Sequence, residues 1–140
     1  MAVTATPVFV QTPKNGNVQI LPADASNLKT IYTGGANGSK IIGLYVTSSD
    51  TSARDVQFGI TVGGVFYPLY TSTIAITAGQ VAATPSVNLL DPSKAVGLPV
   101  DSDGNPFIFL ASASYTLQIK SLTTVTAAKE IDISCFAADF

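Results

Sequence analysis

Short segments in which apolar and polar residues alternate recur along the chain, separated by clusters of Gly, Pro, Asn, Asp and Ser. In residues 115–120 and 130–135 nearly every second residue is apolar, which is typical of strands with one buried face. No window of helical length keeps a period of about 3.6 residues. The pattern therefore predicts an all-β chain with about ten short strands. The expected strands are residues 18–21, 28–33, 40–47, 55–62, 65–70, 74–77, 87–90, 107–111, 115–120 and 130–136.

The strongest local signal is a hairpin whose two-residue turn is Gly63-Gly64. The turn sets apolar residues opposite one another and collects them on one face: Val62 with Val65, Ile60 with Tyr67, and Phe58 with Leu69. Pro68 then lies opposite Gly59 at a position without hydrogen bonds, where its missing N–H faces away from this partner. The hairpin therefore predicts that strand 65–70 is the edge of a sheet.

The spacing of the strands, with turn signals about every 8 to 12 residues, is typical of a two-sheet β-sandwich with a jelly-roll-like topology. At 140 residues the chain fits one domain. Pro7 and Pro13 flank the apolar run Val8, Phe9 and Val10, a pattern that suits an extended arm better than a core strand. We therefore expect an N-terminal arm over residues 1–16 and a single sandwich domain over residues 17–140.

The composition is unusual in its low fraction of charged residues. Only 11% of the residues are charged, against about 25% in an ordinary soluble domain. Ser, Thr and small residues take the positions where Lys and Glu usually stand. A free monomer benefits from surface charge, whereas a subunit that docks onto neighbours avoids desolvating charges at the centre of its interfaces. The composition therefore favours a protein that works in an assembly.

The same composition argues against several classes of function. The chain has no histidine, which removes the usual base for nucleophilic catalysis and the usual zinc ligand. The single cysteine, Cys135, falls in phase with Ile131 and Ile133 and is expected in the core. We therefore expect no enzyme, no cofactor and no metal. The seven basic residues are scattered, which argues against nucleic acid, and no apolar run reaches the roughly 18 residues of a membrane span.

Two loops resemble ligand-binding motifs. Residues 34–38 (GGANG) lead into a strand rather than a helix, so we interpret them as a turn and not as a phosphate loop. Residues 101–105 (DSDGN) resemble the opening of a calcium loop, but Pro106 stands at its sixth position and Ser112 at its twelfth. A polar turn is the preferred interpretation there, and a weak cation site is left open. The carboxylate pair Glu130 and Asp132 falls on the solvent side of its strand.

Several apolar residues fall outside the predicted core and are candidate contacts with a partner protein. The arm residues either fold back as an extra edge strand or dock on a neighbouring subunit by strand addition. The predicted edge strand is a second candidate for such a contact. The candidate contact residues are Val8, Phe9, Val10, Pro68, Tyr70 and Phe140.

Residues 30–35 (TIYTGG), 42–47 (IGLYVT) and 54–58 (RDVQF), followed by the Gly63-Gly64 hairpin, are similar to small structural proteins of tailed phages. Over residues 17–137 the chain most resembles capsid cement, or decoration, proteins, in particular the jelly-roll cement protein of a Bordetella podovirus. The resemblance rests on overall pattern, and no residue role is carried over from it.

The resemblance implies a non-enzymatic jelly roll on the outer surface of a phage capsid, made in the host cytoplasm without a signal peptide. Its partner there is the major capsid protein, whose neighbouring subunits it joins so that the shell is stabilised. Self-association is expected as well, with a dimer favoured and a trimer left open. Two alternatives are a tail or fibre-associated component and a carbohydrate-binding module that uses Tyr32, Tyr45 and Tyr70.

Overall fold

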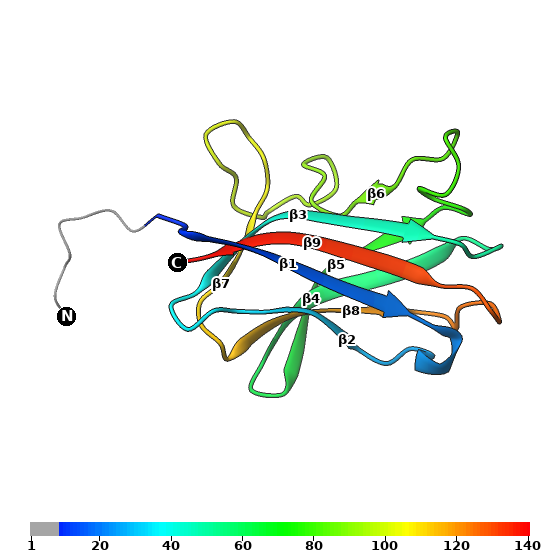
Figure 1. Cartoon of the computed structure of the whole chain (residues 1–140), viewed down its shortest axis with the longest axis horizontal. Helices are drawn as coiled ribbons and strands as arrows, with labels where there is room; N and C mark the ends of the chain where they lie inside the picture. The colour runs from blue at the N-terminus through cyan, green and yellow to red at the C-terminus, as the bar shows by residue number, and fades with distance from the viewer. Residues whose placement is uncertain (1–8) are drawn as a thin grey trace, which may run out of the picture.

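The computed structural model describes residues 9–140, which form two antiparallel sheets packed face to face (Figure 1). One sheet has the strand order β1-β9-β3-β6, with β7 also pairing with β3, and the other has the order β2-β8-β4-β5. The only helix among the described residues is the short 3-10 turn η1. The elements are β1 (Thr12–Ile20), η1 (Pro22–Asp24), β2 (Lys29–Thr33), β3 (Ser39–Ser48), β4 (Arg54–Val62), β5 (Val65–Ile74), β6 (Val87–Asn88), β7 (Ile108–Leu110), β8 (Tyr115–Ser121) and β9 (Ile131–Asp139).

The strands pair as a set of nested hairpins. β1 pairs with β9, β2 with β8, β3 with β6, and β4 with β5. Successive strands from β1 to β3 alternate between the two sheets, so the nested hairpin is rolled into a sandwich. This is the connectivity of a jelly roll, and it confirms the predicted fold class.

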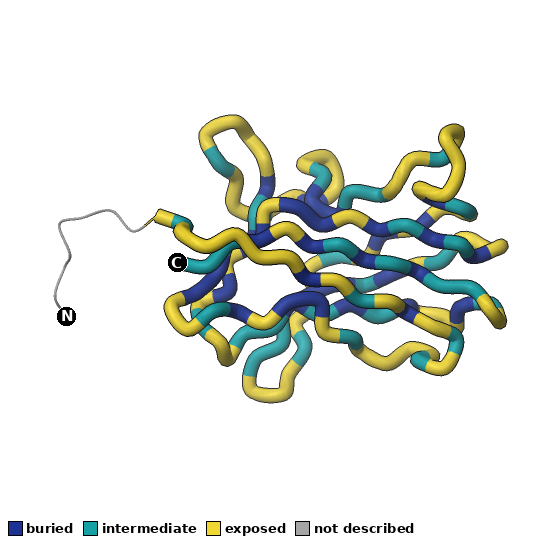
Figure 2. The backbone as a smooth tube through the Cα atoms, in the orientation of Figure 1, coloured by how far each residue is buried: buried dark blue, intermediate teal, exposed yellow. Residues whose placement is uncertain are grey.

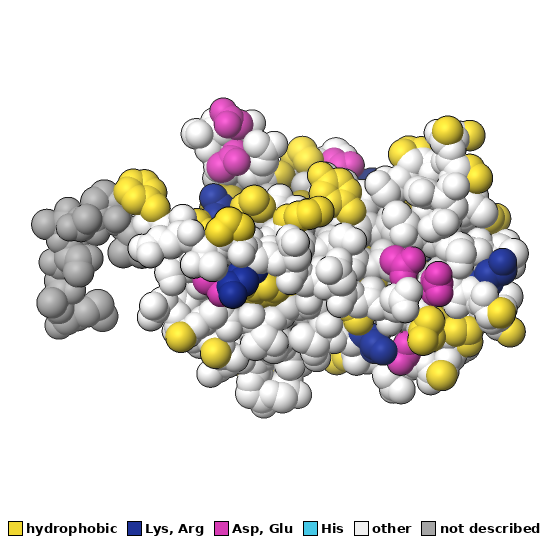
Figure 3. Space-filling view, in the orientation of Figure 1, with side chains coloured by type: hydrophobic (Ala, Val, Ile, Leu, Met, Phe, Trp, Pro, Cys, Tyr) yellow, Lys and Arg dark blue, Asp and Glu magenta, His cyan; other side chains and the backbone are white. Residues whose placement is uncertain are grey.

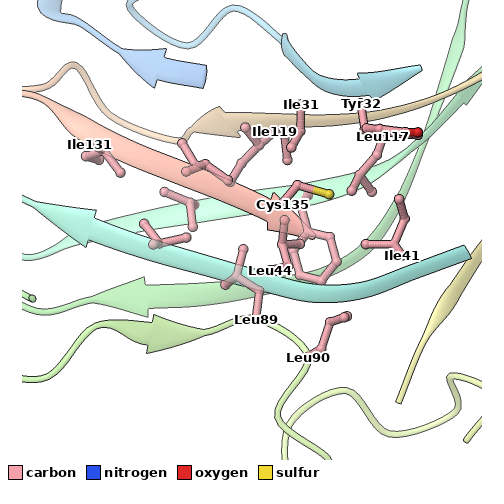
Figure 4. Close-up of a cluster of buried hydrophobic side chains, with 14 of the residues drawn as sticks. Ile31, Tyr32, Ile41, Leu44, Leu89, Leu90, Leu117, Ile119, Ile131 and Cys135 are labelled. Atoms are coloured by element: carbon pink, nitrogen blue, oxygen red, sulfur yellow. The ribbon is translucent and has the colours of Figure 1, made fainter. Parts of the chain in front are cut away.

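The core lies between the two sheets and follows the alternation in the sequence. Figure 2 shows buried and more exposed residues alternating along β3 and β9. Side chains of both sheets meet in the core close-up, among them Leu44 and Cys135 from one sheet and Leu117 and Ile119 from the other (Figure 4). Burying such side chains contributes about 1.5 to 3 kcal/mol each, which explains why the period-two pattern was a reliable guide.

Two predicted boundaries are corrected. β1 begins at Thr12, so residues 12–16 belong to the first strand of the sandwich and not to an arm. Pro13 is tolerated there because β1 is the edge strand of its sheet. The predicted separate strand 74–77 is wrong as well, since β5 runs on to Ile74 and a turn follows it. The prediction for residues 1–8 lies outside the described residues.

The hairpin is confirmed at its turn and corrected further along. Val62 pairs with Val65, Ile60 with Tyr67, and Gly59 with Pro68, but Phe58 pairs with Tyr70 instead of Leu69. The shift is a β-bulge that leaves Leu69 as the extra residue. A Cβ at Gly59 would lie 2.1 Å from the Tyr67 carbonyl oxygen, so only glycine allows this close approach. The bulge turns the Tyr70 ring inward against Phe58, with ring centroids 4.7 Å apart.

Two hydrogen-bonded carboxylates join the loops and the sheets, the buried Asp50 and the half-buried Asp139. Asp50 is fully buried and accepts hydrogen bonds from Arg54, Ser52 and Thr126, which connect the β3–β4 loop to the β8–β9 loop. At the other end of the sandwich Asp139 on β9 accepts from the Tyr32 hydroxyl on β2, at 2.6 Å, and so joins the two sheets. Buried polar groups that are fully hydrogen-bonded fix one arrangement of the chain.

Candidate docking surface

Hydrophobic side chains gather on the outer face of the sheet formed by β9, β3 and β7, on the side turned away from the core (Figure 3). Ile42, Tyr45, Phe109 and Phe136 are exposed at 60%, 41%, 51% and 46%. Two half-buried rings, Phe107 and Phe140, contact Phe109. We call this surface the aromatic patch, defined by Ile42, Tyr45, Phe107, Phe109, Phe136 and Phe140.

The part of the aromatic patch on β3 and β9 depends on a second β-bulge. Between Ile41 and Gly43 the register with β9 shifts by one residue, so Ile42 is the extra residue and stands on the outer face. Gly43 pairs with Phe136, and a Cβ at Gly43 would lie 3.0 Å from the Phe136 ring. The missing side chain leaves room for that ring beside Gly43, and the ring lies edge to face with Tyr45 at a centroid distance of 6.2 Å.

β7 extends the aromatic patch toward the end of the sandwich where the described chain starts and stops. The Phe107 and Phe109 rings are 4.8 Å apart, and Phe109 and Phe140 are 6.0 Å apart. The Lys40 ammonium lies 4.3 Å from the centre of the Phe107 ring, a cation–π contact that keeps a charge at the margin. A cleft of about 340 Å³ borders the patch on the other side, between Ile42, Tyr45, Leu90 and Pro106.

The predicted contact residues are divided between two places. Val10 is half-buried and Phe9 is 71% exposed, and both precede Gln11, whose N–H bonds the Asp139 carbonyl. They therefore leave the sandwich at the end where Phe140 and Phe109 lie. Pro68 and Tyr70 belong instead to the edge strand β5 of the other sheet.

Two of the candidate contacts have partners inside the chain. Tyr70 is half-buried, and its hydroxyl donates to the Leu89 carbonyl. Burial raises the pKa of Tyr70 to about 12. The Phe140 N–H donates to the Gly38 carbonyl. Val8 lies outside the described residues.

The sequence contains a signal for the aromatic patch in the alternation of β3 and β9. Along β9 the residues 131, 133, 135 and 137 are buried, so Phe136 stands in the solvent-facing phase with Asp132 and Ser134. Tyr45 stands in the solvent-facing phase of β3 in the same way. A large aromatic residue in a polar phase indicates a surface that contacts something other than water.

Within the described part of the chain the chemically reactive groups do not come together in one site. Cys135 is buried, and burial raises the pKa of its thiol to about 12. Asp101 accepts hydrogen bonds from the N–H groups of Asp103 and Asn105, which closes the loop 101–105 as a polar turn. Among residues 9–140 no group of three or more His, Cys, Asp or Glu side chains is placed to hold a metal ion. No helix in that range is long and apolar enough to cross a membrane.

The three tyrosines considered for carbohydrate binding do not share a surface role. Tyr32 is buried, and its hydroxyl donates to Asp139. Tyr70 packs against Phe58. Only Tyr45 is exposed, and it belongs to the aromatic patch.

No protein-family model matches the chain, and no curated protein matches it. Among solved structures, similar chains occur in the acidic stable capsid of Helicobacter pylori bacteriophage KHP30 (6% identity, TM-score 0.49, covering 93% of this chain and 90% of that one) and in the capsid asymmetric unit of cyanophage Pam1 (12%, 0.43, 99% and 94%). A third occurs in the virus-like particle of the extra small virus of the giant freshwater prawn Macrobrachium rosenbergii (11%, 0.36, 99% and 87%). All three come from viral particles, and no residue role passes from them to this chain.

Proposed function

We propose that this protein is a structural component of a phage virion that binds the outer surface of the capsid and cements neighbouring subunits of the major capsid protein. The aromatic patch carries the proposal. It places four exposed large apolar side chains on one strand-built face, in a chain with only 11% charged residues. Exposed apolar patches of this kind mark protein interaction sites, and aromatic residues dominate the binding energy of such sites.

The rigidity of the patch suits a cementing function. Its four exposed side chains, Ile42, Tyr45, Phe109 and Phe136, stand on paired β-strands, so little conformational entropy is lost when they are covered. A surface of neutral polar groups around them is desolvated at lower cost than a charged one. A standard interface buries about 800 Å² per partner, and repetition of a modest contact over a symmetric shell gives a large total stabilisation.

The proposal is tested by sedimenting the purified protein with capsids that lack it. We expect saturable binding in a fixed ratio to the capsid subunit. Phe136→Ser should weaken binding by about tenfold or more, because an aromatic anchor at the centre of an interface is worth about 2 kcal/mol or more. Tyr67→Ser is the matched control, since Tyr67 is 55% exposed but stands on the other sheet. Equal binding by both variants would contradict a contact through the aromatic patch.

The N-terminal segment is tested in the same assay by deleting residues 1–10. The deletion stops there because Gln11 bonds the Asp139 carbonyl and β1 begins at Thr12. Weaker binding by the shortened protein would add the arm to the contact with the capsid. No binding by the intact protein would contradict the cement function and lead to tail structures and glycans as the next partners to assay.

A further inference from the structure

The outer edge of β5 is open over half of its length. β5 is the last strand of its sheet, and β4 pairs with it on one side only. Native edges are protected by proline, bulges or charged residues. Here Pro68 and the bulge at Leu69 protect the first half, and none of the ten residues of β5 is charged. The segment from Thr71 to Ile74 contains no proline, no bulge and no charged residue.

The register shows which backbone groups are free in this segment. Val62 and Val65 flank the two-residue turn as a hydrogen-bonded pair, so every second residue of β4, back to Val56, faces β5. Ser72 lies opposite Val56 and directs its N–H and C=O to β4. Thr71 and Thr73 therefore direct theirs to the open side, where no backbone group of residues 9–140 bonds them.

A groove follows this open edge. It consists of two adjacent cavities of about 230 and 450 Å³, which share Tyr70 as a common wall. The first lies between Leu69 and the loop 95–98, and the second lies along Thr71, Ser72 and Thr73, with Lys94 at its rim. The backbone of the open segment is therefore reachable from outside.

The buried hydroxyl of Ser72 is an independent indication that the open edge of β5 binds a partner. Ser72 is 6% exposed, and its hydroxyl has no hydrogen-bond partner among the described residues. It is the one buried side-chain polar atom of residues 9–140 in this condition. A buried polar group without a partner costs free energy, and an unsatisfied group in a native protein calls for an explanation.

We propose that β5 pairs antiparallel with β5 of a second copy of this chain, about a two-fold axis that passes beside Ser72. Thr71 of each copy then exchanges N–H···O=C bonds with Thr73 of the other copy. The two Ser72 residues face each other at a position without backbone hydrogen bonds, where Cβ atoms lie about 4.5 to 5.5 Å apart. In the free chain the Ser72 hydroxyl is covered, so on pairing the side chain changes rotamer, which brings the two hydroxyls together and satisfies the orphaned group.

The second copy fits this edge better than an unrelated partner does. A two-fold contact must be self-complementary, and like charges opposite each other would oppose it. β5 itself carries no charge that could be repelled by its own copy, and the charged side chain at this groove, Lys94, stands at the rim and not on the strand. The open segment is short, so the contact is smaller than the roughly 800 Å² per partner of a stable dimer. The pairing is therefore weak in dilute solution and is favoured where copies are held close together.

A disulfide cross-link tests the register. In Ser72→Cys the two thiols face each other, within the distance of about 4.4 to 6.8 Å between Cα atoms that a disulfide needs. Thr73→Cys is the matched control: Thr73 is more exposed than Ser72, but in the proposed register its own copies lie about 8 Å apart, beyond reach. Cys135 is buried in both variants.

We expect Ser72→Cys to form a covalent dimer under mild oxidation at least about tenfold faster than Thr73→Cys, as the geometry of disulfides requires. Random collision would give the reverse order, because the more exposed thiol would react faster, and that result would overturn the proposal. Urea unfolding of both variants confirms that they are folded.

Hydrogen exchange gives a second readout on the unaltered protein. Exchange of the Thr71 and Thr73 amides should slow as protein concentration rises. The Phe66 amide lies on the same open edge, before Pro68, and should not change. Exchange that does not depend on concentration at Thr71 and Thr73 would also overturn the pairing. Both tests run without capsids, so their failure is distinct from failure of the proposed function.

Discussion

The substitution Asp50→Asn tests whether one buried carboxylate holds two loops of the sandwich together. Asp50 is fully buried. One oxygen accepts from the Ser52 N–H at 3.0 Å and from the Thr126 hydroxyl at 2.6 Å, and the other accepts from Arg54 Nε at 2.7 Å and from the Thr126 N–H at 3.1 Å. Asparagine has one acceptor oxygen, so in either orientation its NH₂ group faces a backbone N–H that can only donate, that of Ser52 or that of Thr126.

The expected loss follows from this geometry. Removing one partner of a buried ion pair costs about 3 to 5 kcal/mol, because the remaining charge is left without compensation. Arg54 keeps a little contact with water, its side chain being 16% exposed, so we expect a value near the lower limit, about 3 kcal/mol. The unfolding entropy of a 140-residue chain is about 0.3 kcal/mol per kelvin. The melting temperature should therefore fall by about 10 °C.

Thermal and urea unfolding measure the effect, with Asp103→Asn as the control, because Asp103 is exposed and makes no side-chain hydrogen bond with the described residues. The control should stay within about 0.5 kcal/mol of wild type. In the double variant Asp50→Asn/Arg54→Met the loss should be smaller than the sum of the two single losses. Additive losses, or a loss below about 1 kcal/mol for Asp50→Asn alone, would refute the view of Asp50 and Arg54 as a coupled pair.

Low pH tests the same pair without a substitution. Burial alone would raise the pKa of Asp50, but the hydrogen bonds from Arg54, Thr126 and Ser52 outweigh it and hold the pKa well below its usual range. A carboxyl whose pKa is depressed by folding adds stability at pH values above its unfolded pKa. That stability is lost as the pH falls below about 4. Wild type should therefore lose stability in acid more steeply than Asp50→Asn does.

Three further predictions concern single positions. Gly59→Ala should cost at least about 2 kcal/mol in urea unfolding, because the new Cβ would lie 2.1 Å from the Tyr67 carbonyl oxygen. Cys135 should resist alkylation in the folded protein at pH 8 and react only on unfolding, since burial raises its pKa to about 12; rapid labelling of folded protein would contradict its burial. Tyr32→Phe removes a hydrogen-bond donor that, after Ser39, helps to hold the pKa of Asp139 below its usual value. NMR titration of Asp139 in that variant should show a higher pKa than in wild type.

The strands were predictable from the sequence where one face is buried throughout. Residues 115–120 and 130–136 were expected as strands, and β8 and β9 span Tyr115–Ser121 and Ile131–Asp139. The first half of β1 was not predictable, because its sequence TPKNG has no alternation. Those residues form a strand because they pair with the backbone of β9, with Thr12 opposite Asp139. A pairing between such distant residues leaves no local pattern.

The bulges at Leu69 and Ile42 could not be predicted from the sequence, for a related reason. A bulge depends on how two strands pair with each other, so the sequence of one strand alone does not show it. At Leu69 it turns Tyr70 onto Phe58, and at Ile42 it moves an isoleucine to the outer face. Half of the aromatic patch depends on the second bulge and on Gly43 beneath the Phe136 ring. Of the six residues of the aromatic patch, Phe140 alone was among the candidate contacts predicted from the sequence.

The two proposed surfaces belong to different sheets, and this makes their joint use testable. The aromatic patch stands on the face of β9, β3 and β7, whereas Ser72 lies on the edge strand of the sheet β2-β8-β4-β5. Pairing through β5 therefore leaves the patch uncovered. The cross-linked Ser72→Cys dimer should sediment with capsids, and adding Phe136→Ser to both halves should abolish this binding. A linked dimer that cannot bind, although the reduced monomer does, would show that the edge and the patch compete for the same partner, and the separation of the two functions between the two sheets would be wrong.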